Sequence, residues 1–98
     1  MYKHIPHDSL YKTNLEQHLN IKHMEEKIQA LIASILKVSE EEITLDTEIG
    51  EPDEWDSLHN MEIIAALEKT FNVKITSNML IDLEDVSDIV NLIEELTK

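Results

Sequence analysis

Apolar residues recur at helical spacing soon after the start of the chain. Between residues 24 and 37 they occupy the i, i+3, i+4, i+7 and i+8 positions that share one face of a helix: Ile28, Leu31, Ile32, Ile35 and Leu36. Glu25 and Glu26 stand in the first turn and Lys37 in the last, which suits the helix dipole. The pattern predicts an amphipathic helix over residues 24–37.

A second helical pattern begins at Asp56 or Ser57 and continues to about Phe71. A carboxylate or hydroxyl before an apolar run is a common helix N-cap. The stripe that we expect to be buried consists of Leu58, Met61, Ile64 or Ala65, Leu67 and Phe71. Glu62 and Glu68 lie off this stripe, so they belong to another face of the predicted helix.

Two shorter elements and a long connection complete the pattern. Residues 77–81 predict one helical turn, and a last helix opens at Asp82 or Glu84. Its inner face should carry Val86, Ile89, Val90, Ile93 and Leu96. Residues 38–55 form a long polar connection, which apolar anchors should hold to the core, namely Ile43, Leu45 and Ile49. We therefore predict an all-α fold: a small bundle of three main helices plus a short fourth, with a long first loop.

Composition restricts the class of protein further. A chain of 98 residues with one glycine, two prolines and few aromatics suits one small helical domain better than a sheet with tight turns. The absence of cysteine excludes disulfides and thiolate metal sites. No apolar run approaches the roughly 18–20 residues that span a bilayer, and the first residues lack the apolar centre of a signal peptide. We expect a soluble cytoplasmic protein.

The charge of the chain is strongly negative and unevenly distributed. The formal net charge is −13, with 21 acidic residues against eight basic ones, all lysine. Residues 1–23 contain three lysines, one aspartate and one glutamate, so they carry +1 and residues 24–98 carry −14. Such a field repels nucleic acid and anionic membranes and attracts basic protein surfaces. Solubility explains the charge equally well, so charge alone identifies no partner.

Residues 1–23 differ in character from the rest of the chain. They are mostly polar, contain four of the five histidines and show weak apolar periodicity. We interpret them as an N-terminal extension ahead of a domain at residues 24–98. The extension is expected to be flexible or to form a short helix around Leu10–Leu19, and a segment added by cloning is a third explanation.

Neither the acidic loop nor the extension has the spacing of a metal site. The acidic residues between Asp46 and Asp56 lack the order and the glycine of an EF-hand loop. The histidines of the extension are His4, His7, His18 and His23. The first two are three residues apart and the last two five, so neither pair has the i, i+4 spacing of a helical zinc site. We predict no dedicated metal site, with loose divalent-ion binding at the acidic loop as the alternative.

Ser57 offers the most specific chemistry, because it follows Asp56 at a predicted helix start. As a cap it would be redundant, since Asp56 can cap the helix alone. A nucleophile would need a base, but His59, two residues on, points away around a helix, and the Gly-x-Ser-x-Gly elbow is absent. An attached phosphodiester would lie beside a helix N-terminus, which favours phosphate. The residues alone leave the three roles open.

The sequence around Ser57 also resembles a known family. Residues 54–68 (EWDSLHNMEIIAALE) are similar to the Asp-Ser-Leu motif and second helix of acyl carrier proteins. Residues 71–75 (FNVKI) resemble the segment that ends that helix, and residues 83–96 resemble the last helix of the family. The likeness extends over about residues 24–98, and it depends on the motif in its full helical context.

The resemblance implies a covalent 4′-phosphopantetheine arm on Ser57, added by a holo-acyl-carrier-protein synthase or another phosphopantetheinyl transferase. The thiol of the arm would carry acyl groups as thioesters, so a chain without cysteine could still perform thiol chemistry. The chain itself would be no enzyme and have no catalytic residue. Three letters do not suffice, because Asp8-Ser9-Leu10 repeats the motif with no amphipathic helix of the right kind behind it.

The resemblance further implies a surface that partner enzymes recognise. The matching positions are Asp56, Leu58, Met61, Glu62 and Glu68. Basic surfaces of the transferase and of acyl-transferring, ligating or condensing enzymes would meet Glu62 and Glu68 in fast, salt-sensitive encounters. A solvated helix face is the alternative explanation of these glutamates. We expect a monomer without a nucleic-acid partner or a membrane span.

Some residues depart from the pattern of fatty-acid carriers. Trp55 stands where many of them have a small residue, and His59 and Lys69 stand where they are often acidic. These departures argue against service to the central fatty-acid synthase. They do not identify the pathway, which could be a fatty-acid, polyketide or other specialised one. Outside the carrier role, an unmodified protein-interaction domain with the same fold and a small esterase using Ser57 and His59 remain as alternatives.

Overall fold

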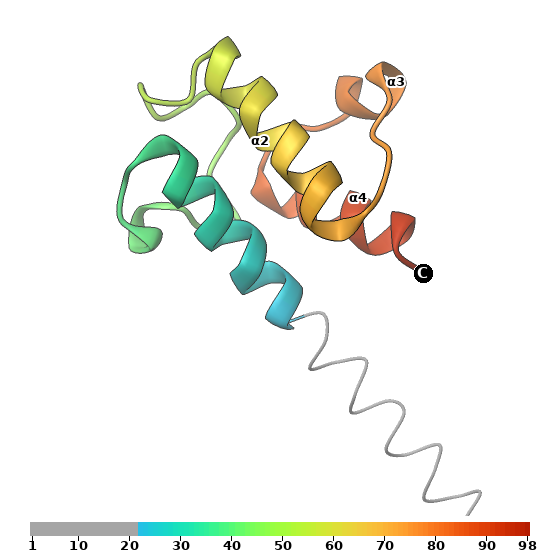
Figure 1. Cartoon of the computed structure of the whole chain (residues 1–98). Coiled ribbons are helices and arrows are strands. Elements are labelled where there is room, and N and C mark those ends of the chain that lie inside the picture. The colour runs from blue at the N-terminus through green and yellow to red at the C-terminus, as the bar shows by residue number, and fades with distance from the viewer. Residues whose placement is uncertain (1–21) are drawn as a thin grey trace, which may run out of the picture.

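The chain folds as a set of helices joined by loops, in a computed structural model that describes residues 22–98 (Figure 1). A first helix covers residues 22–36 of the described range. After it come a single 3-10 turn and three α-helices: η1 (Glu40–Glu42), α2 (Ser57–Phe71), α3 (Ser77–Ile81) and α4 (Val86–Leu96). The predicted all-α bundle of three main helices and a short fourth is confirmed. The short helix considered around Leu10–Leu19 lies outside the described residues.

The ends of α2 agree with the prediction and have local causes. Asp56 is the N-cap, and its side chain accepts the backbone N–H of His59. At the other end Asn72 adopts a left-handed conformation with φ 55° and donates its N–H to the carbonyl of Glu68. Asparagine tolerates this conformation better than most residues, which makes it a common helix stop.

Two other helix ends differ from the prediction. The first helix ends at residue 36, because Lys37 turns into the left-handed region with φ 60°. The last helix was expected to open at Asp82 or Glu84, which is wrong: its N-cap is Asp85. The chain is still extended at Asp85, with φ −140° and ψ 178°, and the carbonyl of Glu84 accepts the N–H of Ile49 at 2.9 Å, so Glu84 pairs with the first loop and lies ahead of the helix.

The helices share one apolar core. Its fully buried side chains include Ile28 and Ile32 of the first helix, Ile63 and Leu67 of α2, and Ile89 and Ile93 of α4. The predicted inner face of α4 is confirmed except at its end, where Leu96 is only half-buried. Within residues 22–98 no helix is long and apolar enough to cross a bilayer.

The predicted buried stripe of α2 is wrong at its start. Leu58 is 66% exposed and Met61 70% exposed, whereas Ile63 is fully buried. Apolar residues surround much of this helix, so their spacing alone allows more than one inner face. Packing against the first helix and α4 selects the face that carries Ile63 and Leu67.

The long first loop is held against the bundle by hydrogen bonds. Gln29 Nε2 of the first helix donates to the carbonyl of Ile43 at 2.9 Å, and the predicted anchor Ile43 is buried. Thr47 is also buried; its hydroxyl accepts the N–H of Thr44 at 2.9 Å, and its carbonyl accepts the N–H of Val86 at 3.0 Å. The loop therefore has defined contacts on both sides before it delivers the chain to α2.

The orientation of α2 can be tested with a pair of substitutions. Ile63→Val removes one methylene from a fully buried side chain and should lower the free energy of unfolding by about 0.5–1.5 kcal/mol. Leu58→Ala truncates an exposed side chain and should change it by no more than about 0.5 kcal/mol. Urea unfolding followed by circular dichroism measures both. A larger loss for Leu58→Ala than for Ile63→Val would contradict the structure.

Candidate functional site

The candidate site lies at the start of α2, where Asp56 supplies the helix cap without help from Ser57. Oδ1 of Asp56 accepts the backbone N–H of His59 at 2.9 Å and lies 2.7 Å from Nδ1 of the same histidine. Ser57 is exposed, and among residues 22–98 no group hydrogen-bonds its hydroxyl. The hydroxyl is therefore available for chemistry.

The imidazole of His59 is engaged by Asp56. A serine nucleophile would need that ring as its base, yet the described contacts of the ring lead to the cap carboxylate. A carboxylate on Nδ1 can also orient a catalytic histidine, but among residues 22–98 no hydrogen bond joins the His59 ring to the Ser57 hydroxyl, so the structure does not show the base that the esterase hypothesis needs.

The carboxylate of Asp56 keeps its negative charge to low pH. Its pKa is held below the ordinary value of 3.8, first by the hydrogen bond from the His59 backbone N–H and second by the hydrogen bond from the His59 ring. An ionised, exposed carboxylate consequently stands directly before the Ser57 hydroxyl at neutral pH.

Trp55 fixes the chain just before the site. Its side chain is only 3% exposed, and its indole Nε1–H donates to Oδ1 of Asn60 at 2.9 Å. Its backbone N–H donates to the carbonyl of Pro52, also at 2.9 Å. These contacts connect the end of the first loop to the first turn of α2. The sequence marked Trp55 only as unusual for the family; its anchoring role and its partner Asn60 were missed.

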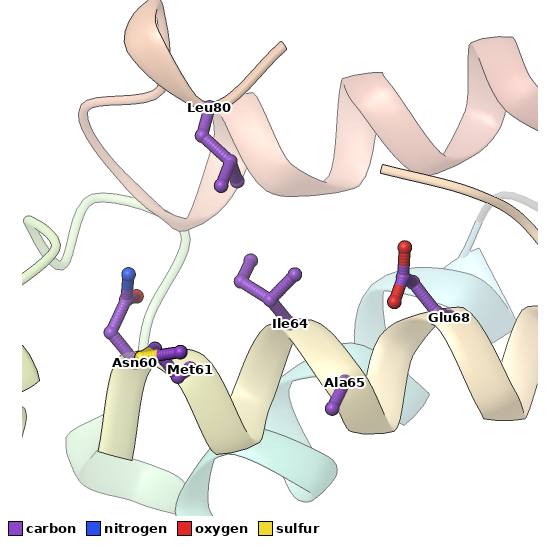
Figure 2. A pocket seen from close by; sticks show the side chains of 6 residues that line it. All are labelled: Asn60, Met61, Ile64, Ala65, Glu68 and Leu80. Atoms are coloured by element: carbon purple, nitrogen blue, oxygen red, sulfur yellow. The ribbon is translucent and has the colours of Figure 1, made fainter. Parts of the chain in front are cut away.

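A pocket of about 290 Å³ lies beside α2, one turn beyond Ser57 (Figure 2). It is lined by Asn60, Met61, Ile64, Ala65 and Glu68 of α2 and by Leu80 of α3. In Figure 2 Leu80 lies across the space from Ile64. The walls are mainly apolar, as in small-molecule sites generally. Neither Asn60 nor Leu80 could be assigned to a pocket from the sequence, because the spacing of α2 and α3 depends on the tertiary fold.

The predicted recognition residues fall into two groups. Asp56, Leu58, Met61 and Glu62 are exposed at the start of α2 and in its first two turns, where a partner could reach them. Glu68 is half-buried, and its Oε2 accepts the backbone N–H of Ile75 at 2.7 Å. That carboxylate therefore ties α2 to the segment that follows it, a structural role that the sequence did not indicate.

Exposed apolar surface extends beyond α2. Ile81, the last residue of α3, is 76% exposed. The sequence gave no reason to select it, since residues 77–81 are too short to show a periodic face.

Metal-ligating side chains are dispersed in the described part of the chain. Within residues 22–98 no group of three or more histidine or acidic residues could hold an ion. Three of the four histidines of the extension, namely His4, His7 and His18, lie outside the described residues.

The hydrogen bonds to Asp56 can be tested by titration. We expect His59→Ala to raise the pKa of Asp56 only part of the way to 3.8, because the backbone N–H, the larger cause, remains. Since folding lowers this pKa, the carboxylate stabilises the fold at higher pH, and that contribution is lost as the pH falls below 3.8 through the folded pKa. NMR titration of the Asp56 carboxyl carbon measures the shift. Complete return to the ordinary value would mean that the ring dominates.

The segment that contains this site is similar to known proteins. The family described as "Phosphopantetheine attachment site" matches residues 26–93. The acyl carrier protein of Onion yellows phytoplasma is 42% identical over 72 residues, which cover 74% of this chain and 95% of that protein. The acyl carrier protein of Borrelia garinii subsp. bavariensis is 36% identical over 69 residues, which cover 70% of this chain and 86% of that protein.

Solved structures show the same fold. The solution structure of a holo acyl carrier protein from Geobacter metallireducens has a TM-score of 0.68 at 23% identity and covers 74% of this chain and 84% of that one. The apo doublet acyl carrier protein from prodigiosin biosynthesis has a TM-score of 0.64 at 17% identity, with 79% of this chain and 39% of that one covered. With the family match and the curated relatives, this chain belongs to the acyl carrier proteins, which are carriers with a phosphopantetheine attachment site and not enzymes.

Proposed function

We propose that this chain carries acyl groups as thioesters on a 4′-phosphopantetheine arm attached to Ser57. It would present them to biosynthetic enzymes of fatty-acid, polyketide or other specialised pathways. The observation that supports the attachment point most strongly is the exposed hydroxyl of Ser57 at the first position of α2, inside the segment that matches the family. Asp56 performs the capping that would otherwise occupy that hydroxyl.

The residues around Ser57 fit such an arm. A phosphodiester on its hydroxyl would lie at the N-terminus of α2, where unpaired backbone N–H groups and the helix dipole favour negative charge. The arm, when bound, supplies the thiol that the cysteine-free chain lacks. Met61, Ile64 and Leu80 line the adjoining pocket with apolar side chains, which would shelter an acyl group from water.

Partner enzymes would dock on the surface formed by Asp56, Leu58, Met61 and Glu62. Two exposed apolar side chains lie there between two carboxylates, a combination that suits a basic surface with apolar contacts. Glu68 adds a negative charge near the far end of α2, although one of its carboxylate oxygens accepts the Ile75 N–H. We further propose that residues 24–98 are the carrier domain, that residues 1–23 are an extension, and that the chain works as a cytoplasmic monomer.

The attachment point is tested by intact mass after co-expression with a holo-acyl-carrier-protein synthase. The wild-type chain should gain about 340 Da, the mass of one arm, and Ser57→Ala should gain nothing. Ser9→Ala is the matched control, because it alters the other Asp-Ser-Leu sequence and should still gain one arm. An adduct on Ser57→Ala would refute the assignment. A wild-type chain that stays unmodified would favour the interaction-domain alternative.

The docking surface is tested by reversing one charge. Glu62→Lys should slow loading by the transferase roughly 2- to 5-fold, the equivalent of one exposed ion pair. The difference should shrink at high salt, because screening weakens exposed pairs. Glu41→Lys makes the same change of net charge at an exposed residue of η1. Equal slowing by both variants would mean that overall charge, and not this surface, governs the encounter.

A further inference from the structure

The pocket beside α2 contains one polar group close to Ser57. Asn60 lies three residues after Ser57, so the two side chains occupy neighbouring positions on the same side of the helix. Beyond it the pocket is lined mainly by apolar groups, up to Glu68. An arm that enters from Ser57 would therefore pass Asn60 first.

Trp55 determines which way the amide of Asn60 points. An indole N–H can only donate, so the atom of Asn60 that faces it at 2.9 Å must be the carbonyl oxygen Oδ1. The amide nitrogen Nδ2, with two N–H groups, is then turned away from Trp55. In Figure 2 this nitrogen extends from α2 on the side of Leu80. No acceptor for it is found among residues 22–98.

The two ends of the pocket differ in hydrogen-bonding character. Asn60 presents donors at the end near Ser57. Glu68, eight residues later and about 12 Å along the helix, presents a carboxylate that the Ile75 N–H holds in place. A group that only accepts hydrogen bonds would be favoured at Asn60 and repelled at Glu68. A carbonyl oxygen is such a group.

We propose that Asn60, oriented by Trp55, donates a hydrogen bond to a carbonyl oxygen of the arm or of its acyl group as it enters the pocket. This inference rests on the proposed attachment to Ser57. The carbonyl has two sources with the same chemistry: the amides of the arm itself, or the thioester and any oxo group of the cargo. Asn60 is thus a residue that positions the arm or its cargo, and Trp55 is the residue that positions Asn60.

The test compares the unmodified chain, the holo chain, a chain loaded with a saturated acyl group and a chain loaded with a 3-oxoacyl group. Intact mass confirms each loading. NMR then follows the side-chain amide of Asn60 and the indole N–H of Trp55. A downfield shift of the Asn60 amide in the holo chain assigns the acceptor to the arm. A shift that first arises with an acyl group assigns it to the cargo, and a larger shift with the 3-oxoacyl group points to its oxo oxygen.

Three variants separate the orientation of the Asn60 amide from the packing around it. Asn60→Asp keeps the acceptor for Trp55 but removes the donor, and it should lower the ratio of pocket-bound to solvent-exposed arm by about 2- to 10-fold, the effect of one hydrogen bond. The methyl resonances of Leu80 report that ratio. Trp55→Phe keeps an aromatic ring but frees the amide, so the shift of Asn60 on loading should decrease. Asn91→Asp, at an exposed position of α4, adds the same charge and should change neither quantity.

The outcomes distinguish the role of Asn60 from the carrier function on which it rests. A chain with no mass increase would overturn both. A loaded chain whose Asn60 amide does not shift in any form would overturn the role of Asn60 and leave the carrier function intact. A pocket occupancy in Asn60→Asp equal to that in Asn91→Asp would do the same.

Discussion

The site depends on which face of α2 is buried in the core. Burial of Ile63 and Leu67 against the first helix and α4 stabilises the core, and each such side chain contributes on the order of 1.5–3 kcal/mol. Once those two residues face inward, helix geometry fixes the direction in which every other side chain of α2 points. Leu58, Met61 and Glu62 must face solvent, and Asn60, Ile64 and Glu68 must border the pocket beside α3.

Local contacts then set both ends of that helix. Asp56 caps its first turn, and the buried indole of Trp55 connects the incoming loop to Asn60. At the far end Glu68 accepts the N–H of Ile75, so the segment that leads to α3 keeps its place relative to α2. These contacts fix the backbone on both sides of Ser57, although among residues 22–98 no hydrogen bond to its hydroxyl is found. A carrier needs this combination, because a modifying enzyme must reach the hydroxyl while the surrounding backbone stays fixed.

The long first loop shows how a polar segment becomes part of a small fold. Its carbonyl and N–H groups pair with the start of α4 through Thr47 and Val86, and with the first helix through Ile43 and Gln29. Buried backbone groups require such partners. The same pairing moves the start of α4 to Val86, later than residue propensities indicate. Helix boundaries in this chain therefore follow tertiary hydrogen bonds wherever the loop contacts them.

By itself the sequence determined the helical class, the range of α2 and the serine at its start. These depend on short-range physics, because apolar periodicity and a capping carboxylate each act on residues a few positions away along the chain. The tertiary structure alone decided that Ile63, and not Leu58 or Met61, faces the core. The reason is that several apolar residues surround α2, and only the position of its neighbours separates one face from another. The orientation of Asn60 by Trp55 likewise needs the buried indole in place, because local spacing does not show where a side chain five residues away will point.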